Sequence, residues 1–379
     1  LVTWGDETID RITYGSVDYF QGNAKYNGTW YKNENPIHTY AKDDVYTINI
    51  EGYLPKFSFY EAYTEAEREI YPQMLIEVSS LDNIGLTSLT KAFYDCQNLR
   101  YVCDMPVNYN FTDMDETFYR CINLTSVGTL PKSLTSMNST FKTCYYLNQQ
   151  ITVPEGVTEL SHTFENCEHL TIFPTILSNA TKFDYAFSNC GFESLAKINL
   201  PYSLVEAPYA FAFCRHLIDT PIIGMGVENC EGMFSCCADL KTITNIPITL
   251  KNGKKMFNGC LSLNRTIPDF PYYIEDISEM YMNCVKLTGN VPYFPASVKK
   301  CKRTFYGCIG LDGYAEDNWT YKNPNFISQS DGTYNCYQCF LGCTNLKNYY
   351  YNYELNGKTY PKIWRGATSI DEDAEGWCG

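Results

Sequence analysis

The sequence predicts a repeat solenoid of about eleven coils of 23–25 residues with short parallel strands, preceded by a small N-terminal β segment. Three observations predict it. A Phe-x-x-Cys-x-x-Leu motif recurs along most of the 379 residues, its copies stand at a nearly constant spacing, and the residues between the copies also repeat. A unit this short cannot bury its apolar side alone, so successive units must stack.

The motif defines the period. Its complete copies are FYDCQNL (Phe93), FYRCINL (Phe118), FKTCYYL (Phe141), FENCEHL (Phe164), FAFCRHL (Phe211), FSCCADL (Phe234), FNGCLSL (Phe257), FYGCIGL (Phe305) and FLGCTNL (Phe340). FSNCGFE at Phe187 lacks the Leu, and YMNCVKL at Tyr281 has Tyr for Phe. The motif cysteines are Cys96, Cys121, Cys144, Cys167, Cys190, Cys214, Cys237, Cys260, Cys284, Cys308 and Cys343. Their steps are 25, 23, 23, 23, 24, 23, 23, 24, 24 and 35 residues, a period typical of a leucine-rich-repeat solenoid.

The rest of each unit repeats too. A Pro often stands ten residues before the Phe or Tyr, at Pro131, Pro154, Pro201, Pro247, Pro271 and Pro295. Apolar residues follow three and six positions after it, as at Leu134 and Met137, and another comes three or four after the motif Leu, as at Val102. The unit therefore has a short extended segment on each side of the motif turn, with its apolar positions facing inward.

This pattern resembles the BspA-like leucine-rich repeats, whose unit also runs Phe-x-x-Cys-x-x-Leu and then an Ile or Leu strand ending in Pro. The resemblance covers Thr87 to about Leu346 and departs in the last unit, where the longer step inserts YAEDNWTYKNPNFISQSDGTYN. It implies a non-catalytic surface module of bacteria, some protists and gut bacteriophages that is associated with adhesion. It names no ligand.

The predicted division is a PKD-like or capping β segment over 1–57, a connector over 58–86, the solenoid over 87–346 and a C-terminal cap or tail over 347–379. VTWGDETID and HTYAKDDVYTINIEGY look like the second half of a PKD-like β-sandwich, although Glu7 and Asp44 stand where that pattern has Gly. These strands could instead cap the first coil. The alternation over 45–50 predicts a half-buried strand, and 58–71 is either a short helix or a polar connector.

Charge and hydropathy exclude several classes. The net charge of −14 opposes binding to nucleic acid or to an anionic membrane surface. The sequence contains no run of 18 apolar residues, so we expect no membrane insertion. The opening LVTWGDETID reads like the middle of a domain, so we expect a fragment or processed product, in which the missing signal peptide is uninformative about export.

The motif cysteines invite a chemical interpretation, but their pattern favours packing. Catalysis would need a base beside one copy, and only His169 and His216 follow a motif Cys by two residues. Zinc needs ligands that converge, whereas these stand one per coil in a column. Parallel side chains in register also give poor disulfide torsion. We therefore expect a structural ladder of reduced, buried cysteines.

Seven cysteines lie outside the ladder: Cys103, Cys230, Cys236, Cys301, Cys336, Cys339 and Cys378. The run of Cys336, Cys339 and Cys343 suggests a metal, but no second pair follows at finger spacing. A disulfide between Cys336 and Cys378 stays open. No phosphate-binding Gly loop, G-x-S-x-G or H-E-x-x-H motif occurs, so we predict neither metal, cofactor nor enzymatic activity.

Tyrosine is the candidate for recognition, because it offers a large contact area and a hydrogen-bonding tip at low rotamer cost. The chain has 33 tyrosines, more than the repeat core requires. The alternative is that Tyr replaces Leu in a loosely patterned solenoid from an AT-rich genome. The candidate binding residues are Tyr145, Tyr146, Tyr272, Tyr273, Tyr293, Tyr349, Tyr350 and Tyr351.

The expected function is therefore non-catalytic surface recognition, in adhesion or receptor binding, on a bacterial cell surface or a bacteriophage fibre. The solenoid flank would contact a host-surface protein or glycan, with other virion or surface proteins as further expected partners. The chief alternative is a purely structural spacer of a virion or cell surface. A carbohydrate-active enzyme is a third interpretation, since any two of 43 acidic residues could converge in space.

Overall fold

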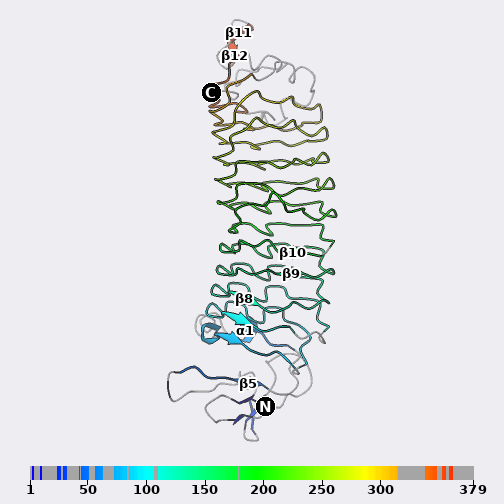
Figure 1. The fold of residues 1–379 in the computed structure, drawn as a ribbon, viewed down its shortest axis with the longest axis vertical. Helices are drawn as coiled ribbons and strands as arrows, with labels where there is room; N and C mark the ends of the chain where they lie inside the picture. Colours follow the sequence, from blue (N-terminus) through cyan, green and yellow to red (C-terminus); the bar gives the residue numbers. More distant parts are fainter. Residues whose placement is uncertain are drawn as a thin grey trace. The chain divides into compact units, whose positions relative to one another are not determined.

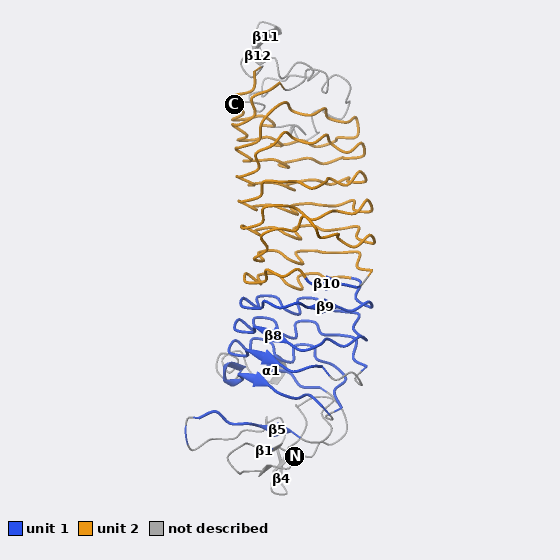
Figure 2. Cartoon of the chain, in the orientation of Figure 1, with its two compact units in different colours: residues 1–158, 174–178 blue, residues 159–173, 179–379 orange. Residues whose placement is uncertain are grey.

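The computed structural model describes most of the repeat region and parts of both ends (Figure 1). The described residues are 2–3, 9–10, 24–26, 29–31, 42, 44–50, 56–62, 72–82, 85–105, 110–177, 179–314, 338–347, 352–355 and 358–361. The chain forms two compact units, coloured blue and orange in Figure 2. Unit 1 comprises residues 1–158 and 174–178, and unit 2 comprises 159–173 and 179–379.

Unit 1 begins with small antiparallel sheets. Strand β1 (Val2–Thr3) pairs with both β2 (Ile9–Asp10) and β5 (Asn49–Ile50), and β3 (Ala24–Tyr26) pairs with β4 (Thr29–Tyr31). The prediction of a half-buried strand over 45–50 is wrong. Only the last two residues form a strand, because β1 offers only two partners, and Val45 is 76% exposed.

The segment that follows these sheets covers the first complete coil. Helix α1 (Phe59–Ala62) donates its first N–H to the carbonyl of Ala92, and the edge of the Phe57 ring meets Phe93 at 5.2 Å. A 3-10 turn, η1 (Pro72–Met74), comes next. Of the two interpretations of 58–71, the structure thus gives a helix of four residues, and the rest of that range lies outside the described residues. The described residues of this segment contact the first coil, and capping of that coil by the N-terminal strands stays a prediction.

Parallel pairing holds the coils of unit 1 together. Strands β6 (Glu77–Val78), β7 (Tyr101–Val102) and β8 (Ser126–Val127) form one parallel sheet, and β9 (Thr152–Val153) with β10 (Thr175–Ile176) forms another. Each strand pairs with the same position of the next coil. The register therefore repeats the period of the sequence.

Unit 2 uses single bridges in place of strands. Parallel bridges join Glu159, Lys182, Glu206, Asn229, Asn252, Asp276 and Lys300, one residue per coil. Near the C-terminus, β11 (Asn352–Leu355) and β12 (Lys358–Pro361) form an antiparallel hairpin. The predicted solenoid of short parallel strands is confirmed.

A column of stacked rings forms the core of each unit. In unit 1 it runs through Phe93, Phe118 and Phe141, with ring centroids 5.4–5.5 Å apart. In unit 2 the rings are 5.4–5.7 Å apart and belong to Phe164, Phe187, Phe211, Phe234, Phe257, Tyr281, Phe305 and Phe340. A ring inside either column thus buries both faces against the coils before and after it.

The motif turn has a backbone signature that the sequence did not predict. Residues two before and two after each motif Phe or Tyr have positive φ, including bulky ones such as Tyr209 (54°) and Phe213 (62°). A left-handed residue with a Cβ is unfavourable by about 1–2 kcal/mol. The conformation lets their N–H groups donate to the next coil, at 2.7 Å to Glu231 and 2.7 Å to Ser235. These hydrogen bonds lock adjacent turns together.

The motif cysteines belong to the same turn, and all eleven are buried thiols. The Phe211 carbonyl shows what the thiol adds: it accepts the backbone N–H of Cys214 at 3.4 Å and the Sγ–H of Cys237 at 3.1 Å. The thiol is therefore more than an apolar filler, because it satisfies the second lone pair of a buried carbonyl.

Thiol reagents are expected to modify few sites in the native protein and most of the 18 cysteines after denaturation. Among the described off-ladder cysteines, Cys103, Cys230, Cys301 and Cys339 are buried and Cys236 is half-buried. Mass spectrometry after brief alkylation should find Cys236 modified before these four. Fast labelling of many ladder thiols in the native state would contradict the packing.

Replacing Tyr281 by Phe is expected to stabilise the protein by about 1 kcal/mol, because it removes a buried polar atom that lacks a partner. The ring stacks between Phe257 and Phe305, and its hydroxyl has no hydrogen-bond partner among the described residues. Urea denaturation should give a higher midpoint at an unchanged slope. The reverse change, Phe257→Tyr, should destabilise, and a destabilised Tyr281→Phe would show that the hydroxyl is satisfied after all.

Candidate interaction surface

A turn at one corner of the unit 2 coils presents large apolar side chains outward. Four successive coils share this turn. In each, the turn begins at a Pro or Gly whose carbonyl accepts, at 3.1–3.4 Å, the N–H of the buried residue three positions later, and the residue directly after the Pro or Gly points outward. The outward residues are Tyr202, Met225, Ile248 and Tyr272, which are 87%, 73%, 64% and 76% exposed. We call these four residues the apolar column.

The register of the coils aligns the column. Four residues after each column residue stand Glu206, Asn229, Asn252 and Asp276, which are joined by parallel bridges. Hydroxyls of the following coils also hold the turns: Ser297 Oγ donates to the carbonyl of Tyr272 at 2.7 Å, and Thr249 Oγ1 donates to that of Met225. The column is therefore fixed by its neighbours before any partner arrives, which lowers the entropy cost of binding.

A row of charges runs beside the column. It lies three residues after the column position of each coil and comprises Val205, Glu228, Lys251, Glu275 and, from the following coil, Lys299. Lys251 pairs with Glu228 at 2.8 Å, and Lys299 pairs with Glu275 at 2.7 Å. We call these five residues the charged row. Its sign alternates from coil to coil after the initial Val.

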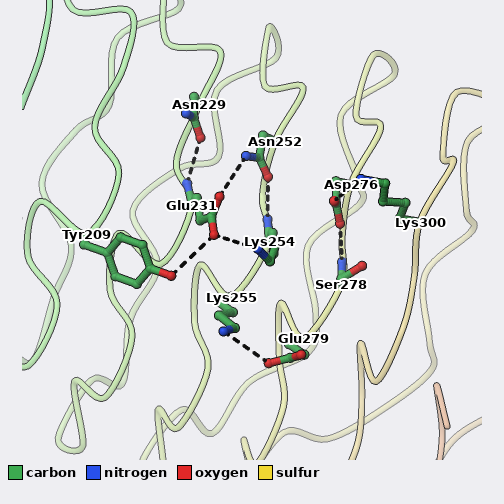
Figure 3. Close-up of polar contacts among 10 residues, drawn as sticks. All are labelled: Tyr209, Asn229, Glu231, Asn252, Lys254, Lys255, Asp276, Ser278, Glu279 and Lys300. Carbon is green, nitrogen blue, oxygen red and sulfur yellow. Dashed lines mark hydrogen bonds and ion pairs between the residues drawn. The ribbon is translucent and has the colours of Figure 1, made fainter. Parts of the chain in front are cut away.

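A polar network follows the charged row (Figure 3). Glu231 accepts from Lys254 at 2.8 Å and from the Tyr209 hydroxyl at 3.4 Å. Burial alone would raise the pKa of the Glu231 carboxyl, but the Lys254 ammonium outweighs burial and lowers it. Asn229 and Asn252 cap the backbone N–H groups two residues on, each at 3.1 Å. These groups hold one another, so the network stiffens the turns.

Stacked aromatic rings form a further column in unit 2. His162, Tyr185 and Tyr209 stack at 5.2 and 4.9 Å, and a Cβ on Gly232 would lie 2.2 Å from the Tyr209 ring. Gly232, with φ of 59°, therefore lets that ring lie against the next coil. Because neighbouring residues cover the faces of these rings, they are poorly placed to stack on a sugar.

The repeat region matches a known protein family. The family described as BspA type Leucine rich repeat region matches residues 86–193 and 183–312 in six copies, more than half of the chain. The chain belongs to this family. The predicted resemblance of this BspA-type protein to its family is thus confirmed, although the PKD-like character of its N-terminal segment stays a prediction. The comparison with curated proteins found no match.

Three solved structures similar to this BspA-type protein come from bacteria. A leucine rich cell surface protein of Faecalibacterium prausnitzii is 20% identical, with 59% of this chain and 74% of that chain covered and a TM-score of 0.33. A leucine-rich repeat protein of Bacteroides ovatus is 19% identical, with 81% and 94% covered and a TM-score of 0.29. The leucine-rich repeat protein of T. pallidum is 25% identical, with 50% and 78% covered and a TM-score of 0.32.

The BspA-type protein does not gather its predicted tyrosines into one site. Tyr145 and Tyr146 form an edge-on pair at 4.9 Å in unit 1, and Tyr272 and Tyr273 form another at 5.1 Å in unit 2. Tyr293, 45% exposed, lies in a different part of its coil. Tyr349, Tyr350 and Tyr351 lie outside the described residues. Only Tyr272 belongs to the apolar column, with Tyr273 next to it.

Sequence reasoning missed Tyr202, Met225 and Ile248, because it searched by residue type. The signal was positional: each is the residue after the Pro that starts a coil, with Gly224 replacing Pro before Met225. An alignment of the units on their motif Phe or Tyr would have shown four large apolar residues at one outward position.

Within the described ranges, no three His, Cys, Asp or Glu side chains gather as metal ligands, and no helix is long and apolar enough to cross a membrane. In the run Cys336, Cys339 and Cys343, the last two are buried, whereas Cys336 lies outside the described residues, as does Cys378.

Proposed function

We propose that this BspA-type protein is a non-catalytic recognition module, displayed on a bacterial cell surface or a bacteriophage fibre, that binds a host-surface protein through its apolar column. One observation carries the proposal: four consecutive coils expose a large apolar side chain at the same position. A contiguous apolar patch on a soluble surface marks an interaction site more often than scattered apolar residues do. Leucine-rich repeat proteins are generally protein-binding modules, which supports the same conclusion.

The composition of the column favours a protein over a glycan as the partner. Met225 and Ile248 have neither a ring to stack on a sugar nor a side-chain hydrogen-bonding group. Tyr202 and Tyr272 are three coils apart, roughly 14 Å at the usual strand spacing. Tyr and Met are enriched in the cores of protein interfaces, whereas Lys and Glu suit the rim, as in the charged row.

The charges beside the column also support a non-catalytic role. Glu228 and Glu275 form ion pairs with lysines at 2.7–2.8 Å, and Glu231 binds Lys254 at 2.8 Å. A general acid or base needs a pKa tuned toward neutrality, whereas Lys254 lowers that of Glu231. These groups stabilise the turns.

The test is binding of the labelled protein to intact epithelial cells and to intact bacterial cells, each after protease or glycosidase treatment. Saturable binding that protease removes and glycosidase leaves is the expected result for one of the two cell types. Loss on glycosidase treatment alone would replace the protein partner with a glycan. Absence of binding to both cell types would favour the structural spacer.

A further inference from the structure

The apolar column and the two central residues of the charged row match their own reversed order. Read along unit 2, the column is Tyr202, Met225, Ile248 and Tyr272, with a Tyr at each end and aliphatic residues in the centre. Beside the two central positions, the row carries Glu228 and Lys251, which are opposite in sign. Reversal exchanges acid for base at the centre, so the surface is complementary to a reversed copy of itself.

An antiparallel dimer uses this match. Its two-fold axis lies in the plane of contact, perpendicular to the direction in which the coils stack, and passes between the coils of Met225 and Ile248. It sets Met225 against the second copy's Ile248, and Tyr202 against the second copy's Tyr272. It also keeps the charged rows of the two copies on the same side, so that Glu228 faces the second copy's Lys251 and Lys251 faces the second copy's Glu228. The two ion pairs join into one network of four alternating charges.

A parallel dimer, with its two-fold axis along the direction in which the coils stack, does not give this match. It would set each column residue against its own copy, and the charged rows would fall on opposite sides of the contact. Only the antiparallel arrangement combines apolar contact with charge complementarity, which sets the orientation of a protein interface and disfavours wrong ones.

We infer that, when no partner protein is bound, a second copy of this chain covers the apolar column in this antiparallel arrangement. The inference rests on the proposed function, because it assigns a second occupant to the same surface and requires the copies to separate before a partner binds. Two buried tyrosines supply roughly 300–500 Å² per copy. Met225, Ile248 and the charged row add to this, so the contact approaches the about 800 Å² per partner of a stable interface.

Charge reversal tests the inference by sedimentation velocity over a concentration series to about 100 µM. The unmodified protein is expected to dimerise. Lys251→Glu puts acids at both central positions and Glu228→Lys puts bases there, so each variant alone should associate at least about tenfold more weakly. An equimolar mixture of the two should form a heterodimer, with association restored to within about threefold. A monomeric unmodified protein, or a mixture that stays monomeric, would overturn the inference.

Lys299→Glu is the matched control. It breaks an ion pair of the same kind in the same row, with Glu275 at 2.7 Å, but lies beyond the four coils that face each other. It should leave dimerisation unchanged, and a loss equal to that of Lys251→Glu would overturn the assigned axis. Cell binding separates this inference from the proposed function, because Lys251→Glu keeps the apolar column. A monomeric protein that still binds cells refutes only the dimer, whereas a dimer that binds no cells refutes only the recognition role.

Discussion

Unit 2 is expected to unfold between about pH 9 and pH 10, because its buried thiols cannot ionise in the native state. Burial raises the pKa of Cys214 to about 12, and burial is also the largest cause of the raised pKa of its neighbours. The unit 2 thiols with a raised pKa are Cys190, Cys214, Cys230, Cys237, Cys260, Cys284 and Cys308.

The sign follows from proton binding. An unfolded thiol releases its proton near pH 8.5, whereas the folded one retains it, so above that pH the unfolded state binds fewer protons and becomes more stable. Each thiol then lowers the free energy of unfolding by about 1.4 kcal/mol per pH unit. Seven thiols together lower it by about 10 kcal/mol per pH unit, against a total stability of about 5–15 kcal/mol. The contribution is fully present below pH 8.5.

Circular dichroism in the presence of a reductant, with urea titrations at each pH, measures the slope. The double variant Cys214→Ala with Cys237→Ala should start somewhat less stable but lose about 2.7 kcal/mol less per pH unit. A native spectrum that persists to about pH 11.5 would mean that the thiols ionise inside the core or lie near solvent.

Replacing Phe234 by Ala is expected to destabilise unit 2 by about 3–5 kcal/mol. The ring is fully buried and stacks on Phe211 and Phe257, each at 5.7 Å. Its removal leaves a cavity between two coils that the hydrogen-bonded ladder keeps at a fixed spacing, so the site cannot collapse.

Tyr202→Ala is the matched control for that variant, because it removes an aromatic side chain of similar size that is 87% exposed. Urea denaturation should give this variant a free energy of unfolding within about 0.5 kcal/mol of that of the unmodified protein. Equal losses in the two variants would contradict the division between a core column and a surface column.

The repeat region could be predicted because its determinants are side chains of one type at one spacing. Phe234 and Cys237 recur in kind, and burial of both follows from the period alone. The left-handed positions recur only in conformation, since Lys91, Tyr209 and Gly232 differ in side-chain chemistry. The cross-coil N–H bonds that select this conformation exist only after the coils stack.

The candidate surface was partly predictable for a related reason. Tyr272 stood out by type, whereas Met225 and Ile248 gain meaning only from their alignment with it. Buried positions restrict residue type through packing, but an exposed turn accepts many residues, so type is a weak signal there. Near the N-terminus, the alternation around Val45 predicted burial, but strand pairing there extends over only two residues.

Binding to intact cells by a column variant tests the central claim most directly. The variant carries Tyr202→Ser, Met225→Ser, Ile248→Ser and Tyr272→Ser, and flow cytometry measures its titration alongside the unmodified protein. A control replaces four exposed residues at other coil positions: Tyr146→Ser, Leu261→Ser, Tyr293→Ser and Ile309→Ser. With both variants folded by circular dichroism, the column variant should bind at least about tenfold more weakly and the control within about twofold of the unmodified protein. Undiminished binding by the column variant, or an equal loss in the control, would contradict the account.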